Sequence, residues 1–81
     1  MTGSQDFLTF AAILADVFDI DPAKITREAT AADIDGWDSV SHATLIMAIE
    51  EFYGFTFSDL EIFSFADVGA LFDRSMQLRT R

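Results

Sequence analysis

Hydrophobic residues recur at intervals of three and four in three separate stretches of the chain. That spacing places apolar side chains along one side of an α-helix. The stretches therefore predict helices over residues 7–18, 39–53 and 65–78. The residues that define the first pattern are Phe7, Phe10, Leu14 and Val17, and those that define the last are Phe65, Val68, Leu71 and Phe72.

The middle helix is apolar on two faces. We expect such a helix to bury one stripe in the core and to offer the other to a binding partner. The two sets are Val40, Ala43 and Met47 on one face, and Leu45, Ile49 and Phe52 on the other.

Both ends of the middle helix carry termination signals. Asp38 and Ser39 stand where the apolar pattern begins, and the side-chain oxygen of either could cap the first backbone N–H groups. Gly54 follows the pattern directly and can adopt the left-handed conformation that ends a helix.

The connections complete the predicted architecture. A long loop from Thr26 to Asp38 contains only Ile34 and Trp37 as large apolar anchors. The segment 58–61 has capping-box spacing and predicts a short helix that ends near Phe63. We therefore predict an all-α fold, a small up-down bundle of three long helices and one short helix, with a long loop between the first two.

Length and charge narrow the possible functions. The 81 residues are enough for one domain, expected to span 1–81, and 51% of them are hydrophobic, which argues against disorder. The net charge is −9, and the span from Glu28 to Asp73 holds ten of the 14 acidic residues with neither Lys nor Arg. Such a field repels nucleic acid and anionic membranes and favours basic partner surfaces. Its alternative role is simply to keep a hydrophobic domain soluble.

Several other classes of site are not expected. The chain has no Cys, so any thiol found on the protein would belong to a cofactor. No apolar run approaches about 18 residues and no signal peptide is visible, so we expect a cytoplasmic monomer without membrane insertion. Asp19 and Asp33 begin stretches like calcium loops, but Lys24 and Asp38 occupy the position that requires Gly, so no metal site is predicted.

Ser39 is the main candidate for chemistry. The start of a helix carries partial positive charge, which favours a phosphate ester at that position. The run Gly36-Trp37-Asp38-Ser39-Val40, followed by an amphipathic helix that ends in Glu50-Glu51, resembles the acyl carrier proteins, whose pattern is Gly-x-Asp-Ser-Leu. The similarity extends from about residue 34 to residue 72, and Val40 in place of Leu is a mild departure.

The resemblance implies a function in tethering. In that family the serine, here Ser39, carries 4′-phosphopantetheine, which a separate phosphopantetheinyl transferase attaches. Asp38 would lie beside the metal-bound coenzyme A during this transfer, or would serve only as a helix cap. The arm would hold acyl intermediates as thioesters and present them to acyl-loading and acyl-processing enzymes with basic docking surfaces. These enzymes would belong to fatty-acid-like, polyketide-like or other specialised biosynthesis.

The partner-binding face is expected on the same helix. Family resemblance places Val40, Ala43, Met47 and Glu50 there, although Ser41 and Thr44 stand where carriers often have acids. This departure favours a dedicated pathway. No catalytic residues are predicted, because the sole histidine, His42, lies three residues beyond Ser39 on the same helix and no third group orients it.

Alternatives remain open for two residues and for the function. His42 could contact the arm or a partner enzyme, although facing solvent is its more ordinary role. Trp37 could anchor the loop, which we favour, or remain exposed as a partner contact. A peptidyl or aminoacyl carrier would share the fold and the arm, but Asp38 stands where peptidyl carriers often have His. An unmodified protein-interaction bundle is the alternative from another class.

Overall fold

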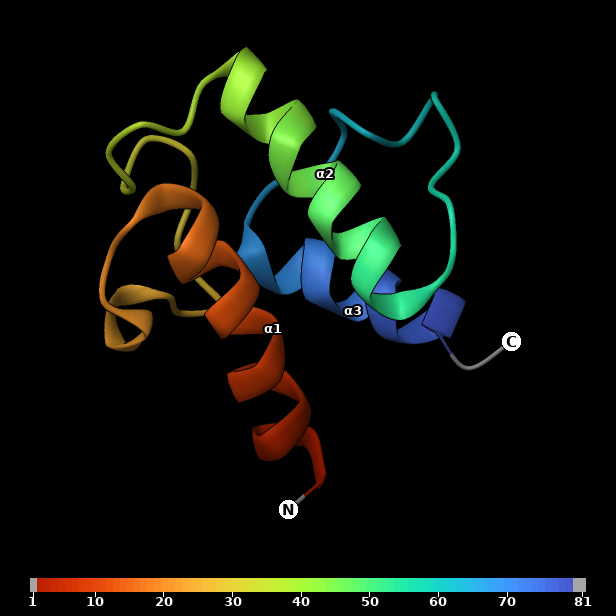
Figure 1. Cartoon of the computed structure of the whole chain (residues 1–81), viewed down its shortest axis with the longest axis horizontal. Coiled ribbons are helices and arrows are strands. Elements are labelled where there is room, and N and C mark those ends of the chain that lie inside the picture. Colours follow the sequence, from red (N-terminus) through yellow and green to blue (C-terminus); the bar gives the residue numbers. More distant parts are fainter. Residues whose placement is uncertain (1, 80–81) are drawn as a thin grey trace.

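The computed structural model describes residues 2–79, with side chains from residue 5 onward. Three α-helices, α1 (Thr2–Phe18), α2 (Ser39–Tyr53) and α3 (Val68–Arg79), are joined by long connections, the first of which contains the 3-10 turn η1 (Pro22–Lys24). Figure 1 shows α1 and α2 running in roughly opposite directions, with α3 lying across them. No strand occurs between residues 2 and 79, so the predicted all-α bundle is confirmed.

The end of α1 is set by its own backbone. Asp19 adopts a left-handed conformation with φ of 56°, and the N–H of Ile20 donates to the carbonyl of Ala15 at 3.1 Å. This bond reaches back over the last turn and satisfies a carbonyl that the helix leaves free. The chain then turns into η1, where the Asp21 side chain accepts from the N–H of Ala23.

The ends of α2 agree with the sequence prediction. Asp38 is the N-cap, with its Oδ1 accepting from the N–H of Ser41 at 2.9 Å, and the Ser41 hydroxyl accepts in return from the N–H of Asp38 at 2.8 Å. This reciprocal pair is a capping box. Gly54 ends the helix with φ of 78°, and its N–H donates to the carbonyl of Glu50. Of the two candidate caps, Asp38 serves and Ser39 becomes the first helical residue.

The core draws on all three helices. Phe10 and Leu14 from α1, Leu45 and Ile49 from α2, and Val68 from α3 are completely shielded from solvent. Of the two apolar stripes of α2, the one that contains Leu45 and Ile49 is therefore the buried one.

Phe52 belongs by its spacing to the same face of α2 as Leu45 and Ile49, but it is not buried with them. Its side chain is 60% exposed, on the edge of a groove where α1 presents the short side chains of Thr9 and Ala12. The ring packs edge-on against Tyr53, with centroids 4.8 Å apart. Helical spacing places a residue on a face, but the neighbouring helix decides how far along that face burial extends.

The connector between α1 and α2 also caps α3. The N–H of Val68 donates to the carbonyl of Ala29 at 2.9 Å, and the N–H of Gly69 donates to the carbonyl of Arg27 at 2.8 Å. A Cβ on Gly69 would come within 3.1 Å of the same Arg27 oxygen, so this close approach favours glycine at position 69.

The predicted start of the last helix is wrong by three residues. The sequence favoured Phe65 as its first residue, whereas α3 begins at Val68 and Asp67 caps it, with its Oδ1 accepting from the N–H of Ala70 at 2.8 Å. The connector supplies acceptors for Val68 and Gly69, and these fix the helix at that point.

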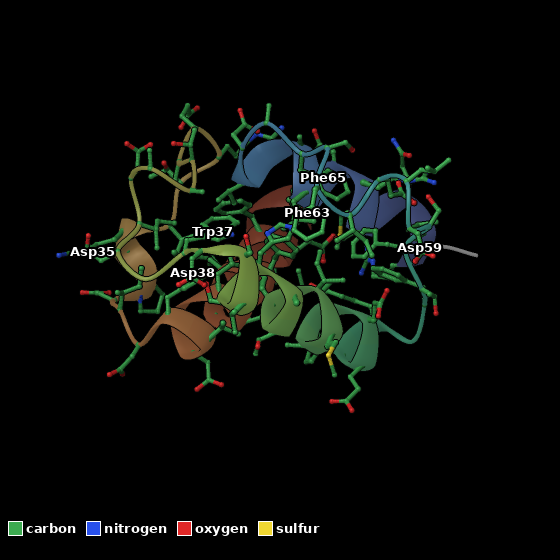
Figure 2. The ribbon with its side chains drawn as sticks, turned by 90° about the horizontal axis from the view of Figure 1, so that it is seen from above. Asp35, Trp37, Asp38, Asp59, Phe63 and Phe65 are labelled. Carbon is green, nitrogen blue, oxygen red and sulfur yellow. The ribbon has the colours of Figure 1, made fainter. Side chains whose placement is uncertain are left out.

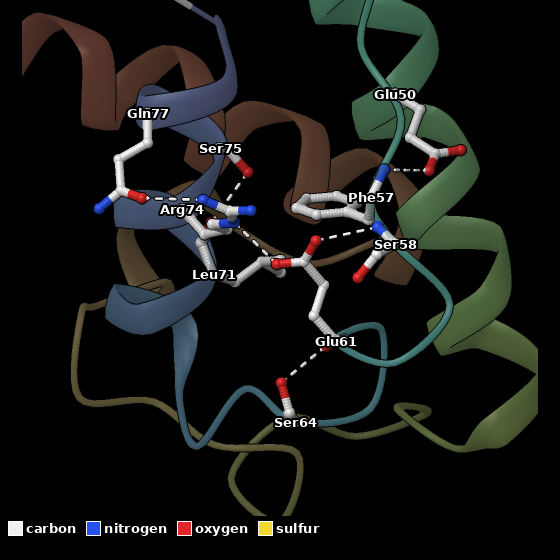
Figure 3. A network of polar contacts seen from close by, with 9 residues as sticks. All are labelled: Glu50, Phe57, Ser58, Glu61, Ser64, Leu71, Arg74, Ser75 and Gln77. Carbon is white, nitrogen blue, oxygen red and sulfur yellow. Dashed lines mark hydrogen bonds and ion pairs between the residues drawn. The ribbon is translucent and has the colours of Figure 1, made fainter.

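The short helix expected at residues 58–63 is also absent. The segment consists of two successive turns, closed by Glu61 N–H to Ser58 carbonyl and Ser64 N–H to Glu61 carbonyl. Figure 3 shows the reason: the Glu61 carboxylate accepts from the Ser58 N–H at 2.9 Å and from Arg74 Nε on α3 at 2.7 Å. The bond to α3 holds the segment from Ser58 to Ser64 against that helix, and this segment is called the strap below.

Candidate functional site

Ser39 opens α2 with its side chain exposed. Within residues 5–79, no side-chain or backbone group forms a hydrogen bond with its hydroxyl. The preceding carboxyl, Asp38, is fully engaged as the cap, and the hydrogen bonds from the Ser41 N–H and hydroxyl hold its pKa below the usual value. The cap therefore stays ionised while the neighbouring hydroxyl remains available.

Trp37 and His42 form a hydrogen-bonded pair beside the serine. Trp37 Nε1 donates to His42 Nδ1 at 3.0 Å, and His42 Nε2 lies 2.7 Å from the carbonyl oxygen of Ile62. An indole nitrogen can only donate, so Nδ1 must accept and Nε2 must carry the proton. The imidazole is thus neutral and fixed in one tautomer.

This geometry changes the prediction for His42. Its more ordinary role, facing solvent, is wrong, because the ring is half-buried and both nitrogens are occupied. The preferred role for Trp37 as an anchor agrees with its position: its ring packs against Phe18 with centroids 5.0 Å apart.

A cavity of about 320 Å³ lies directly alongside Ser39. It opens between the start of α2, the end of the α1–α2 connector and the strap that precedes α3. Figure 2 shows Trp37, Phe63 and Phe65 gathered in this region, with Asp38 near its edge. Its lining consists of Ala31, Trp37, Asp38, Ser39, His42, Phe63, Phe65, Ala66, Asp67 and Leu71.

The structure brings four of the predicted site residues together. Trp37, Asp38, Ser39 and His42 all border the cavity. Glu50 is not among them. It lies eleven residues beyond Ser39, about 16 Å along the helix, and its carboxylate accepts from the N–H of Phe57 at 2.9 Å (Figure 3).

Three other predicted residues lie on the outer face of α2. Val40 is 78% exposed, Met47 is 66% exposed, and Ala43 is exposed between them. They form an apolar stripe that the fold leaves uncovered, as the two-faced pattern predicted.

The far wall of the cavity leaves no signal in the sequence. The sequence predicts Phe65 and Leu71 only as packing residues of the last helix and Phe63 only as the end of a short helix. Nothing in their local spacing marks them as neighbours of Ser39. The contact that places them there, His42 to the carbonyl of Ile62, joins residues 20 positions apart. A periodic pattern carries no information at that range.

The site meets the requirements of a covalent phosphate-linked arm. The serine hydroxyl is exposed, the start of α2 favours a phosphodiester, and the cavity offers space beside it. The family model described as the phosphopantetheine attachment site matches residues 9–74. The chain belongs to this family. Its members carry 4′-phosphopantetheine covalently on a serine, so this protein is a phosphopantetheine carrier.

Membership also sets the class of partner. A phosphopantetheine carrier interacts with the enzyme that modifies it and with biosynthetic enzymes. In the part of the chain from residue 2 to residue 79, none of the helices combines the length and apolarity needed to cross a bilayer.

Proposed function

We propose that this chain is an acyl carrier protein that consists of one non-catalytic carrier domain. It bears 4′-phosphopantetheine on Ser39 and presents acyl intermediates to partner enzymes of fatty-acid-like, polyketide-like or other specialised biosynthesis. The observation that carries the proposal is the cavity beside Ser39, bordered mainly by apolar and aromatic side chains.

Ser39 is the best-placed serine for the arm. It follows the helix cap directly, its hydroxyl is exposed, and it shares the cavity with Trp37 and His42. Its neighbour Ser41 is unsuitable, because its hydroxyl is held in the capping box and also donates to the Gly36 carbonyl at 2.6 Å.

When attached, the phosphopantetheine arm supplies a terminal thiol that holds an acyl group as a thioester. The protein's own contribution is positional. Asp38 fixes the first turn of α2, which orients Ser39 outward, and the α2 N–H groups favour the phosphodiester. Trp37 and His42 supply a rigid wall against which a cargo can pack.

The cavity favours an acyl cargo over a peptidyl one. Both His42 nitrogens are already bonded, and the Asp67 carboxylate caps α3, so few free polar groups remain to pair with peptide amides. Burial of an amide without a hydrogen-bond partner costs free energy, whereas a hydrocarbon acyl chain has no polar group that requires a partner.

The exposed stripe of Val40, Ala43 and Met47 is the proposed docking face. It begins one residue after Ser39, so an enzyme seated on it can reach the arm. The acidic span from Glu28 to Asp73 favours partner surfaces with a basic edge around an apolar centre.

Intact-mass spectrometry tests the attachment. The parent, Ser39→Ala and the control Ser58→Ala are incubated with coenzyme A and a broad-specificity transferase. We expect one added phosphopantetheine on the parent and on Ser58→Ala, and none on Ser39→Ala. Equal modification of Ser39→Ala, or no modification of the parent by several transferases, would contradict the proposal.

The cargo is tested on protein isolated from its native cells. Cleavage of the thioester and mass analysis should release a carboxylic acid without an α-amino group. Recovery of amino acids or peptides would instead identify an aminoacyl or peptidyl carrier.

A further inference from the structure

Resting on the proposed attachment at Ser39, we propose that the adjacent cavity selects a flat, uncharged acyl group, aromatic or conjugated, over a flexible or carboxylate-bearing one. Three features of the cavity favour such a cargo: the shape of its wall, its small volume and its charge.

The wall formed by Trp37 and His42 is flat and fixed. Their ring planes differ by only 18°, their centroids are 6.0 Å apart, and a 3.0 Å hydrogen bond joins their nitrogens. Both the indole N–H and the imidazole lone pair lie in the planes of their rings, so the two rings sit edge to edge. The bond from His42 to the Ile62 carbonyl prevents the imidazole from turning.

Further rings complete the aromatic surroundings. Phe63 packs against His42 at 5.0 Å between centroids, and Phe65 also borders the cavity. Phe18 supports the indole from α1 at 5.0 Å. Aromatic groups prefer offset or edge-on contacts with one another, and a planar cargo can make such contacts with several of these rings.

The cavity is small for a long flexible chain. Its volume of about 320 Å³ is at the low end for a small-molecule site. Leu71, which borders it, is 1% exposed, and Leu45 and Ile49 in the core are fully buried. A longer chain would have to displace these close-packed residues, which is costly.

The charge of the lining disfavours acidic cargo. Asp38 and Asp67 both border the cavity, and no Lys or Arg does. A free carboxylate on the acyl group would be repelled by both side chains, and His42 has no remaining donor to offer it.

The test compares acyl groups of similar size but different shape. The protein is loaded from benzoyl-, cyclohexanecarbonyl- and malonyl-coenzyme A by a broad-specificity transferase, and loading is verified by intact mass. Cleavage of each thioester by hydroxylamine is then timed, relative to the same acyl group on free pantetheine. We expect benzoyl to be protected about 2- to 12-fold more than cyclohexanecarbonyl, the range given by aromatic pairing. Malonyl should be unprotected.

Two variants and one spectroscopic signal test whether the protection of the benzoyl thioester arises in this cavity. Phe63→Leu should reduce benzoyl protection. Phe52→Leu, which removes an aromatic ring of similar exposure from the α1–α2 groove, should not. Trp37 is the only tryptophan, so its fluorescence should change on loading with benzoyl but not with cyclohexanecarbonyl.

The outcomes separate the two proposals. Failure of every coenzyme A thioester to load onto Ser39 would contradict the proposed function. Normal loading with equal protection of benzoyl and cyclohexanecarbonyl, or with no protection of either, would overturn only the inference about cargo. An equal response of both Phe variants would also overturn it.

Discussion

The hydrogen bond between Trp37 and His42 can be measured as a coupling free energy. Trp37→Phe keeps a ring against Phe18 but removes the indole N–H. His42→Leu removes the acceptor and replaces it with a residue that has a good helix propensity. Comparing the two single variants with the double variant isolates the pair from the separate effects of each side chain.

The expected size follows from the contacts. The bond is 3.0 Å long and partly buried, so its net contribution is about 0.5–1.5 kcal/mol. His42→Leu also loses the bond to the Ile62 carbonyl, so this variant alone should lower the free energy of unfolding by about 1–3 kcal/mol. Trp37→Phe should cost less than His42→Leu.

Urea unfolding followed by circular dichroism gives the values, because fluorescence is lost with the tryptophan. With a slope near 1 kcal/mol/M, 1 kcal/mol moves the midpoint by about 1 M. As a control, Trp37→Phe is combined with Leu8→Ala on the exposed side of α1, where no coupling is expected. A Trp37–His42 coupling no larger than this control would refute the fixed aromatic wall.

Three further results are expected. Met47→Glu should lower kcat/KM for modification by a transferase about fivefold or more. Leu8→Glu, at a similarly exposed position on α1, should leave kcat/KM unchanged. Equal effects of the two variants would contradict the proposal that the stripe with Met47 is the docking face. Gly54→Ala should lower the unfolding free energy by about 1 kcal/mol, and Gly54→Asn by less, because φ there is 78°; an unchanged urea midpoint for the Ala variant would contradict this. Tyr53→Phe should raise stability by up to about 1 kcal/mol, since the Tyr53 hydroxyl is buried without a partner within residues 5–79. Burial raises the pKa of the Tyr53 hydroxyl above its ordinary value, so in alkali the unfolded chain loses this proton before the folded protein does, and the parent loses stability as the pH rises. The Phe variant should therefore lose less stability in alkali.

The central helix could be predicted because its signals are local. The cap at Asp38, the left-handed end at Gly54 and the buried stripe with Leu45 and Ile49 all depend on residues within a few positions of one another. The same holds for Ser39, whose place at the start of the helix follows from the cap next to it.

The errors arose where distant segments decide the outcome. The sequence predicted that the last helix begins at Phe65, whereas the carbonyls of Arg27 and Ala29 fix its start at Val68. Glu61 had the right spacing for a short helix, but its carboxylate also binds Arg74. Such contacts override local spacing, and no periodic pattern encodes them.

The cavity beside Ser39 depends on the same kind of contact. Its walls come from the connector, α2, the strap and α3, and they meet because His42 binds the carbonyl of Ile62. The sequence pointed to Ser39 as the candidate residue, but it gave no sign of the cavity beside it.

The most direct measurement is to locate the arm on the chain. Trypsin should release residues 28–74 of the modified protein as one fragment, because Arg27 and Arg74 are the nearest cleavage sites and no Lys or Arg lies between them. Tandem mass spectrometry of this fragment then distinguishes Ser39 from Ser41, Ser58 and Ser64. The account predicts phosphopantetheine on Ser39 alone, and its presence on any of the other three serines would contradict it.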